Sequence, residues 1–188
     1  MCIRDRVIGE AQNGVMERGE IVDMPKKQQD NLFRQIGLGA LKYFILKVNP
    51  RKRMTFNPQE SVDLQGNTGP YIQYSYVRCS GVARKAQELN MDLAKEYTDL
   101  QPQEKALIIQ LFQFPETIQE AAKDYDPSLI AAYCYDLARL YHKFYHDVSI
   151  LKADSEAAQA FRLQLSKVVA DTLTSGMDLL GIEMPERM

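Results

Sequence analysis

The stretch from Asp126 to Leu151 carries a row of cationic side chains with an aromatic ring beside them. Three- and four-residue steps separate the members of this row, which are Arg139, His142, Lys143 and His146. Residues at this spacing share one face of an α-helix. Arginine and lysine attract phosphate oxygens, and a ring such as Tyr145 can stack on an unpaired base. These residue types therefore predict a face that binds an anion, with RNA as the sharper hypothesis.

The two histidines of this row raise a second possibility, a metal site. His142 and His146 are four residues apart, and Asp136 or Asp147 could supply a further ligand. A metal ion at this position would lie among arginine and lysine side chains, which repel it. We therefore predict no metal site, and an independent metalloenzyme would need a third ligand from elsewhere in the chain.

Only a helix can position this row. Asp126 can cap the first turn, and Pro127 suits the next position because its missing N–H would be unpaired there anyway. An apolar stripe follows the same period about a third of a turn away and should form core: Ile130, Tyr133, Cys134, Leu137, Tyr141, Phe144 and Val148. The stretch thus predicts one helix that is buried on one side and cationic on the other.

The rest of the chain also has helical periodicity, so the fold class predicted is an all-α antiparallel bundle. Residues 1–27 are punctuated by glycines and predict an irregular lead-in, whose first six residues we exclude as an artefact of how the sequence was obtained.

A helix from Gln28 should end before Asn49-Pro50. The basic triplet Arg51 to Arg53 fits a solvated turn and a phosphate contact equally well. Further helices are predicted to begin near Asn57, Pro70, Pro102 and Asp154 or Ser155, the Pro102 helix with Leu107, Ile108, Leu111 and Phe112 buried.

Composition limits the class of protein. The 188 residues include 45% hydrophobic and 26% charged residues, with a formal net charge of -2. This predicts a soluble globular domain without a generally basic surface. The three cysteines have no metal-binding spacing, and no stretch is apolar enough for a membrane span or a signal peptide, so we expect a cytoplasmic protein. Glycine-rich phosphate loops and the GxSxG and HExxH motifs are absent from the sequence.

Several short segments resemble the carboxy-terminal part of bacterial arginyl-tRNA synthetase, a class I aminoacyl-tRNA synthetase. Gly39 to Phe44 is similar to the DALRYF segment of that family. The other similar segments are Thr55 to Pro58, Gly66 to Tyr74, Tyr135 to Ala138 with Phe144 to His146, and Gly181 to Met188. Their order, spacing and coincidence with the chain end make the resemblance specific. Gly81 departs from it, because the family more usually has serine or another small helix former there, and residues 1–6 match nothing.

This resemblance implies a tRNA-binding fragment. Residues 71–188 would form the helical anticodon-binding domain, and residues 28–70 the connector from a missing catalytic domain. The parent enzyme, expected to be monomeric, joins arginine to its tRNA in protein biosynthesis, using ATP and magnesium. The HIGH and KMSK motifs that hold ATP have no counterpart here. We therefore expect no cofactor in this chain, no catalytic residue and no activity from the chain alone.

The resemblance also implies roles for single residues. Tyr145 and Met188 would lie near anticodon bases, with His146 beside them. Arg78 and Arg84 match basic positions where phosphate contact is expected. The start of the domain would be organised by Asn67, Gln73 and Tyr74.

A rival hypothesis of another class is a free-standing helical module that binds protein. Such a module would need an exposed apolar patch in place of a basic face.

Overall fold

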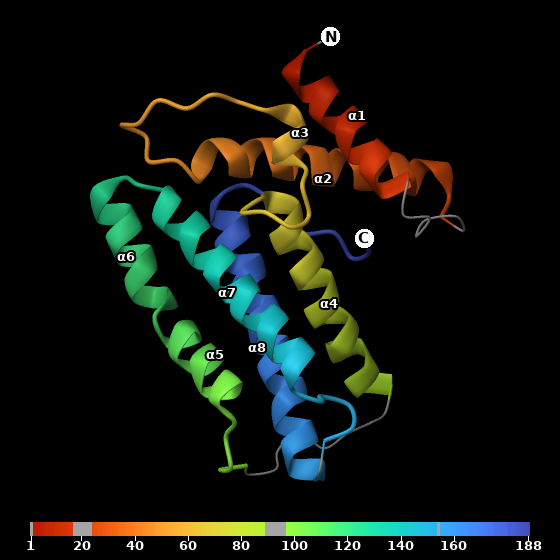
Figure 1. Cartoon of the computed structure of the whole chain (residues 1–188), viewed down its shortest axis with the longest axis vertical. Helices are drawn as coiled ribbons and strands as arrows, with labels where there is room; N and C mark the ends of the chain where they lie inside the picture. Colours follow the sequence, from red (N-terminus) through yellow and green to blue (C-terminus); the bar gives the residue numbers. More distant parts are fainter. Residues whose placement is uncertain (1, 17–23, 89–96, 154) are drawn as a thin grey trace.

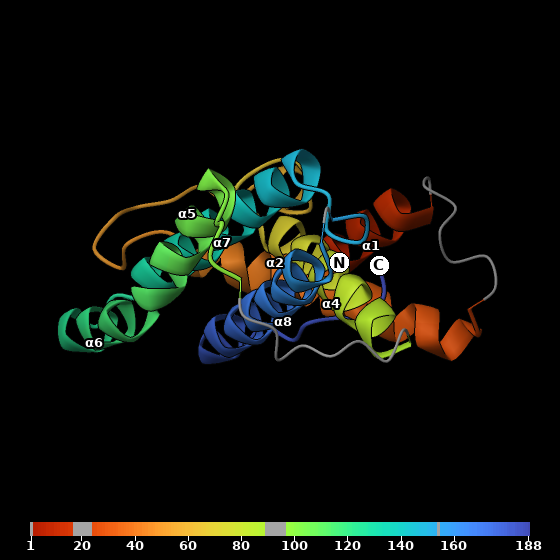
Figure 2. The same ribbon diagram turned by 90° about the horizontal axis from the view of Figure 1, so that it is seen from below.

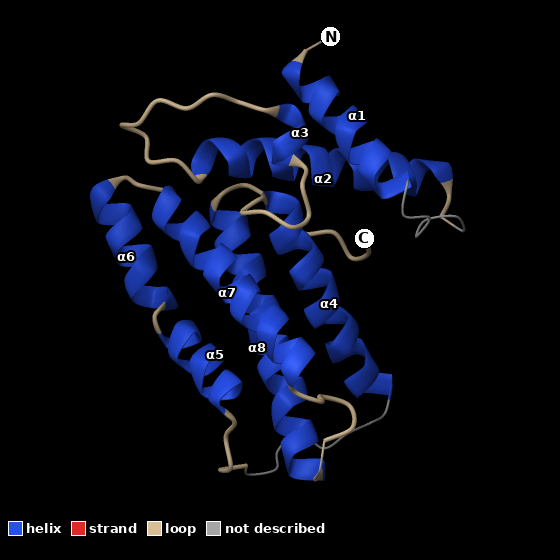
Figure 3. Ribbon diagram, viewed as in Figure 1, coloured by secondary structure: helices blue, strands red, loops and turns tan. Residues whose placement is uncertain are grey.

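The computed structural model describes residues 2–16, 24–88, 97–153 and 155–188. Across these ranges the chain forms helices and loops and contains no strand (Figure 3). The helices are α1 (Ile3–Met16), α2 (Lys26–Leu46), α3 (Pro58–Ser61), α4 (Gly69–Glu88), α5 (Pro102–Phe112), α6 (Phe114–Asp124), α7 (Ser128–Asp147) and α8 (Glu156–Leu179). The predicted all-α fold is confirmed.

The helices form a bundle, and α2 lies across one end of it as a crossbar (Figure 1). Helices α4, α7 and α8 pack side by side, and α5 and α6 cover α7 on the side away from α4. Helix α8 runs antiparallel to α4 and α7, and α2 crosses the end of the bundle where α4 and α7 begin. Seen from below, in Figure 2, the same neighbours remain in contact. Among the described residues, no helix combines the length and the apolar character that a bilayer span requires.

Helix α7 forms where the sequence predicts it. The Asp126 carboxylate accepts hydrogen bonds from the Ser128 backbone N–H at 3.0 Å and from its hydroxyl at 2.6 Å, which caps the first turn. Every residue of the predicted apolar stripe is buried. Other predicted ends are also confirmed: Asn57 caps α3, Ser155 caps α8, and Gly181 follows α8 with a φ of 67°.

The prediction of an irregular lead-in over residues 1–27 is wrong for residues 3–16, which form α1; residues 1 and 17–23 lie outside the described ranges. Val7, Ala11 and Val15 recur every four residues and are buried, the latter two in the small core that α1 forms with α2. Gly37 of α2 permits this contact, because a Cβ there would lie 2.8 Å from the Ile8 Cα. Burial of an apolar face thus outweighs the glycines that suggested irregular structure.

Helices α2 and α4 approach closely at two glycines. A Cβ on Gly69 would lie 2.7 Å from the Gly39 carbonyl oxygen, and a Cβ on Gly39 would lie 2.6 Å from the Gln73 side-chain nitrogen. The Gln73 amide is fully buried there and donates to the carbonyl oxygens of Gln35 at 3.3 Å and Glu183 at 2.8 Å. This one side chain therefore joins α2, α4 and the carboxy-terminal tail.

The predicted burial of α5 needs correction. Pro102 begins the helix, and a break at Gln113 separates it from α6, whose second residue is Pro115, as the sequence indicates. Leu107 is buried, but Ile108 is 37% exposed and Phe112 is 87% exposed. A helix of 11 residues that packs chiefly on α7 has one covered face, and these two side chains lie outside it.

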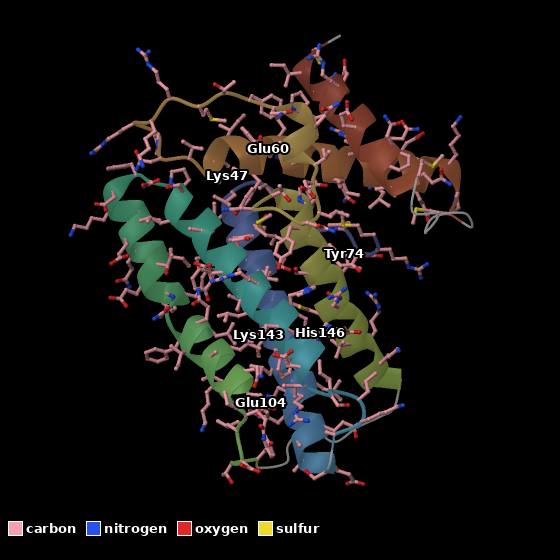
Figure 4. The ribbon with its side chains drawn as sticks, in the orientation of Figure 1. Lys47, Glu60, Tyr74, Glu104, Lys143 and His146 are labelled. Atoms are coloured by element: carbon pink, nitrogen blue, oxygen red, sulfur yellow. The ribbon has the colours of Figure 1, made fainter. Side chains whose placement is uncertain are left out.

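A buried ion pair fastens the start of α5, where Figure 4 labels Glu104, to α8. Glu104 is fully buried and accepts from Arg162 Nε at 2.6 Å with one oxygen and from the Gln101 backbone N–H at 2.6 Å with the other. Arg162 also donates to the Ser149 carbonyl oxygen at 2.9 Å. The pair thus links α5, α8 and the loop between α7 and α8, and both charges are satisfied.

Glycine substitutions in α4 should have opposite effects at its two glycines. Gly69→Ala should lower the free energy of unfolding by about 1 to 3 kcal/mol, because the methyl group meets the α2 backbone. Gly81→Ala should raise it by about 0.5 to 1 kcal/mol, since the Cβ would meet only Arg84 Nη2, at 3.8 Å, within the helix interior. Urea unfolding followed by circular dichroism measures both, and equal effects would contradict the close approach.

Removing one partner of the buried ion pair should be costly. Glu104→Ala leaves the Arg162 charge buried without its partner, so we expect a loss of about 3 to 5 kcal/mol in the free energy of unfolding. The double variant Glu104→Leu with Arg162→Met removes both charges and should recover most of that loss. With the single variants Glu104→Leu and Arg162→Met, urea unfolding completes a double-mutant cycle that gives the coupling energy. A loss below about 1 kcal/mol for Glu104→Ala would rule out this role.

Candidate functional site

An aromatic and cationic cluster spans α4 and α7, and we call it the α4–α7 cluster: Tyr74, Arg78, His142 and Tyr145. The Arg78 guanidinium lies 4.8 Å from the centre of the Tyr74 ring and 4.8 Å from the centre of the Tyr145 ring. Arg78 also donates to the Tyr74 hydroxyl at 2.9 Å and to His142 Nδ1 at 3.2 Å. The Arg78 guanidinium is held by cation–π contacts with two rings and by two hydrogen bonds. The same contacts hold the two rings in place.

Helical spacing explains why these side chains meet. Tyr74 and Arg78 are four residues apart on α4, so they lie one above the other. Tyr145 lies next to the buried Phe144 on α7, and its ring contacts Tyr141 at a centroid distance of 6.3 Å. The Tyr145 side of α7 therefore borders the core, while 42% of the residue remains exposed. An exposed ring held by fixed neighbours is suited to stack on another flat group.

The remaining basic residues of the predicted row surround this cluster on α7. Arg139, Lys143 and His146 are exposed, and Figure 4 shows Lys143 and His146 on the same part of the helix. Arg139 pairs with Asp136 at 3.4 Å, and His146 Nδ1 lies 3.7 Å from an Asp147 oxygen. Exposed pairs of this kind are weak and leave these side chains accessible to phosphate.

The pKa of His142 is lowered from its ordinary value of 6.5. Burial of the ring is the largest cause, followed by the positive charges of Arg78 and His146. Since Arg78 can only donate, the Nδ1 atom that receives its hydrogen bond must be unprotonated. His142 is therefore neutral at pH 7 and acts as an acceptor that helps to hold Arg78.

Other predicted site residues lie apart from the α4–α7 cluster. Arg84 is exposed further along α4, and Met188 packs partly on the small core between α1 and α2. Asn67 accepts from the Tyr43 hydroxyl at 2.6 Å, and Gln73 is the buried amide between α2 and α4. Asn67 and Gln73 thus occupy the start of α4 and contact α2. Their role in organising that region stays a prediction.

The structure gives two residues, His142 and Tyr74, a place in the α4–α7 cluster that the sequence did not predict for them. His142 appears in the predicted cationic row, yet its contact with Arg78 is not apparent from α7 alone. Tyr74 is predicted as a structural residue, whereas its ring forms one side of the stack. The i, i+4 spacing of Tyr74 and Arg78 is the sequence signal for their contact. Among the described residues, no group of three or more histidine, cysteine, aspartate or glutamate side chains is placed to hold a metal ion.

Comparison with protein families identifies the class. Residues 72–188 match the family model described as DALR anticodon binding domain. The fold and this match define a helical anticodon-binding domain, and the chain belongs to the DALR anticodon-binding domain family. The predicted resemblance to the carboxy-terminal part of arginyl-tRNA synthetase is thereby confirmed.

Individual relatives agree with the family. The chain is 48% identical to arginine–tRNA ligase of Porphyromonas gingivalis over 99% of its length, and 44% identical to that of Bacteroides thetaiotaomicron over 99%. Both alignments cover 32% of the relative, so the chain spans about a third of the length of these relatives. Since they reach nearly the whole chain, the prediction that residues 1–6 match nothing in the family is wrong.

Solved structures give the same result. The arginyl-tRNA synthetase of Thermus thermophilus superposes with a TM-score of 0.85 at 30% identity, covering 99% of this chain and 32% of that one. The synthetase of Plasmodium falciparum has a TM-score of 0.80 at 24% identity, covering 98% of this chain and 33% of that one, and supports the fold.

Removing the Arg78 charge should raise the pKa of His142. In Arg78→Met the positive neighbour is gone, so the histidine should protonate closer to its ordinary 6.5. Because the folded state holds a proton less readily than the unfolded state, His142 stabilises the fold above about pH 6.5, and this contribution decreases as the pH falls. NMR titration of the two histidines, assigned with His142→Gln, measures the shift. An unchanged midpoint would contradict the Arg78–His142 contact.

Proposed function

We propose that this chain recognises the anticodon arm of an arginine tRNA through the α4–α7 cluster and the cations beside it on α7. The observation that carries the proposal is the stack of Tyr74, Arg78 and Tyr145, which holds an exposed ring in one orientation. A ring fixed before binding loses little conformational entropy when a base stacks on it. Tyr145 would meet an unpaired base, and Lys143 and Arg139 would attract the phosphates on either side.

The fixed geometry gives Arg78 a different role from that of Lys143. Arg78 directs its guanidinium at two rings and a histidine within the protein, so its principal effect would be on base stacking. Lys143 is exposed and would contribute long-range attraction. Anticodon preference would thus come from the rings, and overall affinity from the exposed cations, among which we include Arg84. Contacts of Met188 and His146 with the anticodon loop remain part of the proposal.

The parent enzyme would attach arginine to this tRNA with ATP and magnesium in the cytoplasm. The family and the names of the relatives support this proposal for the longer protein. We expect this chain to hold neither ATP nor magnesium itself; the missing ATP-binding motifs in the sequence support this expectation. The chain alone would therefore bind tRNA and leave aminoacylation to the catalytic domain of its parent.

One observation favours the rival function of a protein-interaction module. Ile108 and Ile109 precede Phe112 by four and three residues on α5, and the three are 37%, 61% and 87% exposed. Together they form an apolar ridge on the side of α7 away from α4. This ridge would contact protein, and it lies apart from the cationic face of α7, so the two surfaces can be tested separately.

Two substitutions on α7 should weaken tRNA binding in different ways. Tyr145→Ala should reduce the preference for the intact anticodon over an altered one, because a lost base stack costs about 1 to 3 kcal/mol. Lys143→Ala should weaken binding to both RNAs and lower the slope of log affinity against log salt by roughly 0.7 to 0.9. Equilibrium binding to an arginine tRNA and to an anticodon variant of it, at two salt concentrations, measures both effects.

Two control variants give this experiment its contrast. Lys167→Ala removes an exposed lysine from α8, and Phe112→Ser alters the apolar ridge of α5; both should leave tRNA binding within about twofold. If Phe112→Ser lowered tRNA binding and Tyr145→Ala left it unchanged, the proposed face on α7 would be wrong and the tRNA contact would lie on the α5 ridge.

A further inference from the structure

A second cationic surface lies at the opposite end of α7 from Tyr145. It consists of the basic loop, Arg51 to Arg53, and the end of α6 with the turn that follows it, which include Lys123 and Tyr125. All five side chains are exposed, and Tyr125 is 88% exposed. Figures 1 and 2 show the loop between α2 and α3 extending beside the end of α6 in both views.

Hydrogen bonds fix the loop to this turn. The Asn49 side-chain oxygen accepts from the Arg51 backbone N–H at 3.0 Å, and the Lys52 N–H donates to the Asn49 carbonyl oxygen at 2.9 Å. The Asn49 amide nitrogen donates to Asp126, the residue next to Tyr125. On the other side of the basic triplet, Phe56 packs edge-on against Phe44 of α2 at a centroid distance of 5.1 Å. Both ends of the basic loop are therefore anchored.

The charges of this surface remain available to a ligand. The three loop cations form no ion pair with any described residue. The pKa of Asp126 is lowered, chiefly by its hydrogen bonds with Ser128 and Asn49, and the nearby charge of Arg51 lowers it further. Asp124 at the end of α6 and Asp126 in the turn are the neighbouring carboxylates, so four cations face two acidic groups. The surface keeps a positive excess in a chain whose net charge is -2.

Tyr125 gives the surface a second property of nucleic-acid contacts. Its φ of 51° is left-handed, because the residue ends α6, and its ring is almost entirely exposed. An apolar ring in this position has no packing role in the folded chain. Exposed cations interleaved with an exposed aromatic ring are the arrangement that contacts phosphates and stacks on bases or packs on ribose.

We propose that the basic loop and Tyr125 form a second RNA-binding surface, which contacts the same tRNA outside its anticodon loop. This inference rests on the proposed function. The position follows from α7: Asp126 and Tyr145 are separated by 19 residues of chain, or about 28 Å at 1.5 Å per residue. One RNA can reach both surfaces only if it extends well beyond the loop that Tyr145 contacts. Charge complementarity with its phosphates favours RNA as the occupant.

Binding of the full chain to two RNAs tests this surface: an intact arginine tRNA and its isolated anticodon stem-loop. The triple variant Arg51→Gln, Lys52→Gln and Arg53→Gln should bind the intact tRNA about tenfold more weakly at low salt, with a salt slope lower by roughly 2. Its affinity for the stem-loop should match that of the unmodified chain. Tyr125→Asn, which suits the left-handed backbone, should weaken tRNA binding about fivefold.

A matched control has the same change in charge. Lys26→Gln, Lys27→Gln and Lys167→Gln together remove three exposed cations from α2 and α8, and circular dichroism confirms the fold of both triples. Equal binding by the two triples would overturn the proposal and favour an acidic protein surface as the partner of the loop. Equal losses on the tRNA and the stem-loop would overturn the separate location.

The outcomes also separate this inference from the proposed function. If the unmodified chain discriminates the anticodon while the loop triple behaves like its control, only the second surface is wrong. If the loop triple weakens binding but the unmodified chain shows no anticodon preference, the second surface is supported and the proposed recognition by α7 is wrong. An unmodified chain that binds no tRNA overturns both.

Discussion

The buried amide of Gln73 sets the position of the crossbar on the bundle. Its nitrogen donates to carbonyl oxygens of α2 and of the carboxy-terminal tail, so three segments far apart in sequence share one polar side chain. The geometry is possible only because Gly39 and Gly69 have no side chains where α2 and α4 meet. Since a buried amide is costly when its hydrogen bonds are lost, small displacements of α2 are disfavoured.

The position of α2 in turn determines where both candidate RNA surfaces lie. The Tyr43 hydroxyl of α2 lies within hydrogen-bond distance of Asn67 and of the Ala131 carbonyl oxygen in α7, at 2.6 and 3.0 Å. Lys47, labelled in Figure 4 at the end of α2, donates to the Asn67 carbonyl oxygen at 2.8 Å. These contacts place the first turns of α4 and α7 relative to α2. The basic loop begins directly after α2, so its position follows from the same contacts.

Much of the fold can be predicted from the sequence because local signals and burial agree. Helix α7 combines a capping Asp126, a well-placed proline and an apolar stripe, and each favours the same helix. Helix α1 lacks such agreement, since Gly9 and Gly14 obscure an apolar face that only packing on α2 stabilises. The exposure of Phe112 likewise depends on which neighbour α5 meets. Information of this kind resides in contacts between segments, which periodicity cannot supply.

The candidate site shows the same limit at the level of single side chains. The cationic row on α7 follows from spacing, but the orientation of Arg78 depends on rings and a histidine from two helices. An arginine enclosed in this way gives up part of its attraction for distant phosphate and gains a fixed direction. Lysines and arginines on the exposed faces keep their long-range attraction and lack that fixed direction. A domain that must both attract an RNA and read its bases needs both kinds of cation, and here they lie on different parts of α4, α7 and the basic loop.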